Sequence, residues 1–175
     1  MNFAEIRGSI SPEEKMGRKS VRENKNVYQT AREELGLTRE AAEELLEVVS
    51  SDRIEKIESE KTLARPDEVL RMAECYKKSE LCNYYCSHEC PIGEKYVQPV
   101  EMKDLSQITL EVLSNLNILE KEKSRLIEIT VDGVISEDEK EDFELIKQRL
   151  DEMAKTISSL SLWADNAVNT GKIKA

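Results

Sequence analysis

Apolar residues recur every three or four positions in four short segments of the chain, between residues 27 and 75. This spacing places them on one face of an α-helix, so each segment predicts a short amphipathic helix. The segments are Val27–Leu35, Arg39–Leu46, a third around Ile54 and Ile57, and a fourth from Pro66. Residues that end or cap helices separate them: Gly36, Thr38, Ser50 and Ser51. A helical module is therefore expected over residues 26–77.

A second apolar pattern fills residues 101–170. Its later half alternates spacings of three and four: Phe143, Ile146, Leu150, Met153, Ile157, Leu160, Ala164 and Ala167. Its earlier half repeats every seven residues: Leu105, Val112, Leu119 and Leu126. Both are the spacing of helices that pack along one seam, so a long, coiled-coil-like helical hairpin is expected, turning at residues 131–134. Its open side carries further apolar side chains, which predicts a homodimer through the C-terminal helices: Leu113, Ile118, Leu145, Leu162 and Trp163.

The turn of this hairpin fits two interpretations. Asp132, Gly133 and Glu139 resemble the second half of a calcium-binding EF-hand loop. Ser136 and Glu139 also form the Ser-x-x-Glu capping box of a following helix, which explains the same residues without calcium.

Together these patterns predict an all-α protein in four parts. Residues 1–25 lack a sustained apolar period and are expected to form a flexible basic arm. Residues 26–77 form the helical module, and residues 78–100 a cysteine-rich connector interrupted by Pro91, Gly93 and Pro99. Residues 101–170 form the dimerising hairpin.

The helical module resembles a known family over two runs, Leu37–Ala42 and Ser50–Lys61. The second run reads Ser-Ser-Asp-Arg-Ile-Glu-Lys-Ile-Glu-Ser-Glu-Lys. Both are similar to the phage-repressor (Cro/C1, Xre-type) helix-turn-helix family. The resemblance implies a domain that places its third helix in the major groove of double-stranded DNA. One departure is the turn at residues 47–49, which is one residue longer than the family's glycine-containing turn.

The resemblance also implies roles for polar residues. Base contacts would come from the start of the third helix: Ser51, Asp52, Lys56 and the nearby Arg53. Contacts to the DNA backbone would set the register: Arg39, Ser59 and Lys61. The expected DNA-binding set also includes the head of that helix and the basic arm: Ser50, Lys15, Arg18, Lys19 and Arg22.

The charge of the chain restricts this interpretation. The net charge is −10, and residues 38–61 carry eight acidic and four basic side chains. Lys and Arg supply most of the sequence-independent affinity for DNA, so binding would have to be local and assisted by the arm. The alternative is a protein-interaction adaptor on a helix-turn-helix fold that does not bind DNA, whose acidic face docks a basic partner.

All four cysteines fall within sixteen residues: Cys75, Cys82, Cys86 and Cys90. Four thiolates are the ligand set of zinc and of iron–sulfur clusters, so a structural or sensory metal site is predicted. A single continuous helix would spread these residues too far apart for one ion, so the chain must reverse direction between them. Buried free thiols and a redox-switched disulfide are the alternatives, and the single histidine, His88, is expected at the surface.

No set of catalytic residues is recognisable, so an enzyme is not expected. The N-terminal residues lack an apolar core of a signal peptide, and no run reaches the length of a membrane span, which predicts a cytoplasmic protein without membrane contact. The sequence therefore favours a dimeric, sequence-specific, DNA-binding transcriptional regulator.

Overall fold

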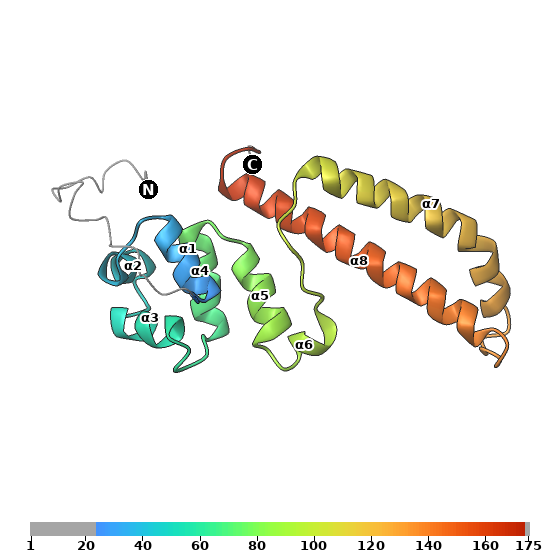
Figure 1. Cartoon of the computed structure of the whole chain (residues 1–175), viewed down its shortest axis with the longest axis horizontal. Coiled ribbons are helices and arrows are strands. Elements are labelled where there is room, and N and C mark those ends of the chain that lie inside the picture. Colours follow the sequence, from blue (N-terminus) through green and yellow to red (C-terminus); the bar gives the residue numbers. More distant parts are fainter. Residues whose placement is uncertain (1–23, 174–175) are drawn as a thin grey trace. The chain divides into compact units, whose positions relative to one another are not determined.

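The computed structural model describes residues 24–173, and this part of the chain is all-helical, with eight helices and no strand (Figure 1). The predicted all-α class is confirmed. The helices fall into two compact units, which divide the described residues into 24–95 and 96–173.

The first unit contains five helices and most of a sixth: α1 (Val27–Glu34), α2 (Arg39–Leu46), α3 (Ser51–Glu58), α4 (Pro66–Tyr76), α5 (Glu80–His88) and α6 (Gly93–Tyr96). The predicted caps are present. Thr38 accepts a hydrogen bond from the backbone N–H of Ala41 at 3.1 Å, and Ser50 accepts one from Arg53 at 3.3 Å. These side chains satisfy amide groups that the first helical turn leaves without a partner, so α2 and α3 begin as expected.

The core of the first unit is one cluster of buried side chains with α4 at its centre. α4 contacts α1, α2 and α5. Its Val69, Met72 and Tyr76 are at most 2% exposed. The other buried apolar residues come from each of the surrounding segments: Tyr28, Ala31, Ala42, Leu46, Val49, Ile54, Ile57, Ala64, Ala73 and Leu81.

Much of the stretch predicted as a cysteine-rich connector is folded onto this core. α5 packs against α4, and Leu81 is buried. Beyond α5 the chain turns back so closely that a Cβ on Gly93 would lie 1.9 Å from the carbonyl oxygen of Cys86. Only glycine fits there. Residues 78–95 therefore belong to the first unit.

The second unit contains α7 (Leu105–Thr130) and α8 (Lys140–Asn169), which run antiparallel beside each other (Figure 1). Asp104 caps α7 by accepting a hydrogen bond from the backbone of Gln107 at 3.0 Å. In the turn, the Glu139 carboxylate accepts a hydrogen bond from the Ser136 backbone at 3.0 Å. This contact matches half of the predicted capping box.

The apolar stripe predicted along α8 does not coincide with the seam between the two helices. Ile146 and Ala167 are buried, but Leu150, Ile157 and Leu160 are exposed. Polar side chains occupy buried positions instead: Thr156 and Ser159 are at most 6% exposed. Of the residues expected on the open side, Leu113 and Leu145 are exposed, Leu162 is buried, and Ile118 and Trp163 are half-buried.

Candidate nucleic-acid interface

α3 turns an apolar face inward and a polar face outward. Ile54 and Ile57 are buried in the core. Asp52 and Lys56 are four residues apart, so they share a side of the helix, and both are exposed. Ser51 is half-buried at the head of the same helix. The structure thus leaves three of the predicted base-contact residues accessible on α3.

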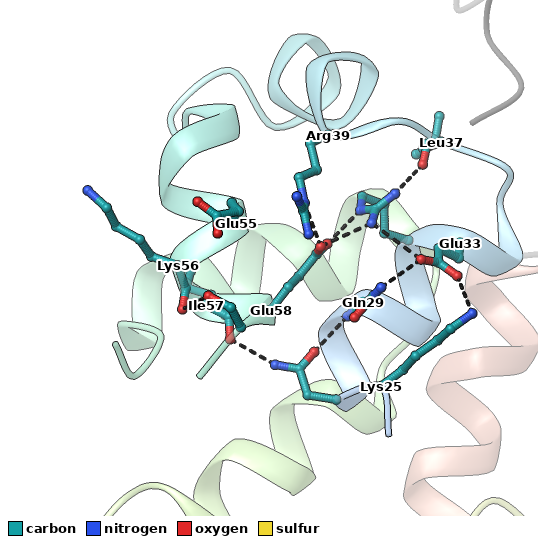
Figure 2. Close-up of polar contacts among 12 residues, drawn as sticks. Lys25, Gln29, Glu33, Leu37, Arg39, Glu55, Lys56, Ile57 and Glu58 are labelled. Atoms are coloured by element: carbon teal, nitrogen blue, oxygen red, sulfur yellow. Dashed lines mark hydrogen bonds and ion pairs between the residues drawn. The ribbon is translucent and has the colours of Figure 1, made fainter. Parts of the chain in front are cut away.

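Lys56 is the accessible cation of this face. Within residues 24–173 its ammonium group makes no ion pair, and Figure 2 shows its side chain extending away from the neighbouring cluster of charges. A lysine without an internal partner can donate to a base or a phosphate without first breaking another contact.

That neighbouring cluster is built around Glu58, a buried carboxylate at the end of α3 (Figure 2). Arg32 of α1 contacts it through two nitrogen atoms, with Nη2 3.0 Å from Oε2. Arg39 of α2 donates to the same Oε2 at 2.9 Å. Arg32 also donates to the carbonyl of Leu37. The Glu58 carboxylate therefore links α1, α2 and α3.

Burial alone would lower the pKa of the Arg32 guanidinium. The hydrogen bond and the negative charge of Glu58 outweigh this effect and raise the pKa of Arg32 above its usual value. The Arg32 guanidinium in the core is therefore compensated mainly by Glu58, with Glu33 as a second carboxylate at 3.7 Å.

Arg39, predicted to contact the DNA backbone, is thus engaged within the protein. It is half-buried, and its Nε donates to the carboxylate of Glu58, the last residue of α3. Its place in the structure explains how α2 is held against α3. A second bond supports the same packing, since the backbone N–H of Ser51 donates to Glu43 at 3.1 Å.

Arg53, predicted to lie near the bases, is directed to α4 and the preceding loop. Its Nε and Nη2 donate to the two oxygens of Glu68 at 2.9 and 2.8 Å. It also donates to Thr62 at 2.6 Å and to the carbonyl of Leu63 at 2.8 Å. The hydrogen bond with Glu68 raises the pKa of Arg53. Arg53 therefore links α3 to α4 and to the loop that precedes α4.

Lys61 and Ser59, which are also predicted to contact the DNA backbone, each make a contact within the protein. Lys61 donates to Glu55 at 2.9 Å, and this hydrogen bond lowers the pKa of the Glu55 carboxyl. Both side chains are substantially exposed, and exposed ion pairs contribute little to stability, so Lys61 can exchange this partner for a phosphate. Ser59 donates to the backbone carbonyl of Lys56 at 3.4 Å.

A shallow hollow lies beside the head of α3. Its volume is about 430 Å³, and it is lined by Val48, Ser50, Arg53, Arg65 and Glu68. Val48 is 70% exposed there. Ser50 thus combines its role as a helix cap with a position on this accessible surface.

The outer face of α2 is acidic. Four exposed glutamates follow one another along it: Glu40, Glu43, Glu44 and Glu47. Such a face repels phosphate and limits how closely DNA can approach α2. The basic residues expected to offset it, Lys15, Arg18, Lys19 and Arg22, lie outside the described residues.

The four cysteines do not assemble into a metal site. The chain does reverse after α4, as a metal site would require, and Lys77 adopts a left-handed conformation there. Cys75 nevertheless donates to the carbonyl of Leu45 at 3.6 Å, and Cys90 accepts from the backbone of Gly93 at 3.4 Å. Between residues 24 and 173, no group of three or more Cys, His, Asp or Glu side chains is placed to hold a metal ion.

The thiols are also not joined in disulfides, and all four are half-buried. Cys82 packs against the core, and burial raises the pKa of the Cys75 thiol. The arrangement therefore offers no fit for the predicted zinc ion or iron–sulfur cluster. Cys75 and Cys82 pack against the core of the first unit, as small apolar residues do.

Sequence reasoning missed the buried charged residues Arg32, Glu58 and Glu68. The sequence contained a signal for Glu58. Glu58 lies four residues after Ile54 and next to Ile57, on the inward side of α3. An acidic residue on an apolar face requires a buried partner.

No family model, curated protein or solved structure matches this chain. Among the described helices, none is both long and apolar enough to cross a membrane.

Proposed function

We propose that this chain is a sequence-specific DNA-binding regulator of transcription that reads bases with α3. In this proposal α2 and α3 are the two helices of a helix-turn-helix unit, as the resemblance to the phage-repressor family implies. The observation that carries it is the construction of α3. Its inner side is anchored by Ile54, Ile57 and Glu58, while Asp52 and Lys56 remain exposed. A rigid helix with an open polar face suits base recognition in the major groove.

We propose a smaller set of DNA-contacting residues than the resemblance implies. Lys56, Asp52 and Ser51 are the base-contact candidates, and Lys61 is the phosphate-contact candidate nearest to them. Arg39 and Arg53 position α3 through Glu58 and Glu68. Binding with so few cations would be modest without the arm, and its dependence on salt would be shallow.

The direct test is footprinting of the full-length protein on the DNA upstream of its own gene, with unrelated DNA of equal length as the control. A protected site that persists in excess competitor DNA is the expected result. Equal affinity for both DNAs at moderate salt would contradict sequence-specific reading.

A second function is favoured by the acidic outer face of α2. In this alternative the module is an adaptor that docks a basic partner protein. Asp52→Ala separates the two functions. A base contact through Asp52 predicts loss of preference at one base pair, because a carboxylate accepts from the cytosine amino group. A face that only repels phosphate predicts tighter binding to every DNA sequence after the substitution, which would favour the adaptor.

A further inference from the structure

The α7–α8 unit exposes apolar side chains that its own two helices do not cover. Six of them, each between 38 and 56% exposed, form the surface called here the apolar face: Leu116, Ile127, Leu150, Ile157, Leu160 and Val168. Exposed apolar side chains gathered on one surface are typical of an interaction site.

These residues lie on one side of the helix pair. Asn115 of α7 donates to Thr156 of α8 at 3.0 Å, which marks the seam between the helices. The next residue in each helix, Leu116 and Ile157, lies about 100° further round in the same rotational sense. Two antiparallel helices are related by a twofold rotation, so equal offsets from the seam fall on the same side. Leu116 and Ile157 therefore face solvent together.

The seam itself is partly polar. Asn115 pairs with Thr156 within it, and Arg125 pairs with Asp142 across the helices at 2.7 Å. A hairpin that functioned alone would place its longest apolar stripe in the seam. Here Leu150 and Ile157 of that stripe are outside, which is the arrangement of a hairpin that forms half of a larger bundle.

We infer that the apolar face is covered by a second copy of this chain, with the two hairpins antiparallel across a twofold axis. The apolar stripe of α8 has the spacing 3, 4, 3, 4, 3, 4, 3, which is the same when read backwards. Two copies of α8 that run in opposite directions therefore place the exposed Leu150 opposite Leu160, and Ile157 opposite Met153. Such a self-complementary surface is what a twofold interface requires.

The distribution of charge selects the same orientation. Residues 128–144, around the turn of the hairpin, contain eight acidic residues and one lysine. Parallel copies would bring two such ends together and repel each other. Antiparallel copies keep the two acidic ends apart.

Dimerisation does not depend on DNA reading, so the experiment is made without DNA. Sedimentation velocity of the full-length chain at micromolar concentrations is expected to show a dimer. Ile157→Asp is expected to produce a monomer, because it would bury a carboxylate in an apolar interface. Ser158→Asp, which adds the same charge at the neighbouring exposed position, is the matched control and is expected to remain dimeric.

A monomeric unmodified chain would overturn the inference and indicate a different partner for the apolar face. A dimeric, helical Ile157→Asp variant would overturn it as well. If that variant loses its helical circular dichroism, amide hydrogen exchange in the unmodified chain decides. Exchange in α8 that slows as protein concentration rises supports the dimer, and exchange independent of concentration contradicts it.

Discussion

The two units of this chain use apolar and charged residues in opposite ways. The first unit buries apolar side chains from α1 to α5 in one cluster, and the charged groups buried beside it are ion-paired, although Leu63, Leu70 and Ile92 are exposed. The second unit places polar residues in its seam and leaves leucine and isoleucine outside. The first unit thus has a contiguous core of its own, and we infer that a partner surface completes the second.

The largest expected effect comes from the buried carboxylate of the first unit. Glu58→Ala should lower the free energy of unfolding by about 3–5 kcal/mol, because the buried Arg32 would lose its main carboxylate partner and keep only the more distant Glu33. Urea unfolding followed by circular dichroism measures this change. Glu44→Ala, which removes an exposed glutamate of α2, is the control and should change stability little. Equal effects of the two substitutions would show that the cluster does not hold the helices together.

A smaller effect is expected at Glu68, with a signature in pH. Burial acts to raise the pKa of Glu68, but hydrogen bonds from Arg53 and from the Arg65 backbone outweigh it and lower that pKa. A lowered pKa in the folded state gives stability that is present above the usual glutamate pKa and is lost as the pH falls through the folded value. Glu68→Gln should cost about 1–3 kcal/mol near neutral pH and flatten the loss of stability in acid. Glu74→Gln, at an exposed position of the same helix, should leave the pH profile unchanged, and parallel profiles for all three proteins would contradict this account.

The comparison between units also predicts different responses to protein concentration. Unfolding of the dimeric α7–α8 unit should become less favourable by about 1.4 kcal/mol for each tenfold rise in concentration, since dissociation accompanies it. Unfolding of the first unit should not depend on concentration. Urea unfolding at several concentrations, with hydrogen exchange to assign each transition, measures both. If the free energy of unfolding depended on concentration equally in both units, the prediction that only the α7–α8 unit dimerises would be wrong.

The smallest predicted effect concerns the connection from α2 to α3. Glu47 has a φ of 64°, and the N–H of Val48 donates to the carbonyl of Leu46 at 2.7 Å. These two features define a γ-turn centred on Glu47. Residues other than glycine adopt this turn with strain. Glu47→Gly should stabilise the protein by about 1 kcal/mol, because its exposed contact with Arg71 contributes little. Glu44→Gly, inside α2, should destabilise by a similar amount. Thermal unfolding distinguishes the two, and a loss of stability in Glu47→Gly would show that the turn is unstrained.

The sequence predicts the parts of this fold that local interactions decide. The bounds of α2 and α3 follow from Thr38, Ser50 and the apolar spacing, because a cap and its amide lie three residues apart. The partners of Arg32 and Arg53 lie 26 and 15 residues away, so nothing in their neighbourhood identifies Glu58 or Glu68.

The same limit applies to the stripe of α8. A spacing of three and four residues shows which side chains share a face of a helix. It does not show whether that face meets α7 or a second chain, because both would bury it. In the structure Leu150 and Ile157 are exposed, so α7 does not bury them.

We propose that α3 reads DNA through Lys56, and a competition binding experiment with Lys56→Ala tests this role directly. Against the protected site, this variant should bind about 1–3 kcal/mol more weakly and lose preference at one base pair, while its affinity for unrelated DNA changes little. Lys121→Ala removes an exposed lysine of α7 and should match the unmodified protein at every site. Equal weakening of Lys56→Ala on the specific and the unrelated DNA, with no change in base preference, would contradict the claim and reduce Lys56 to a contact with phosphate.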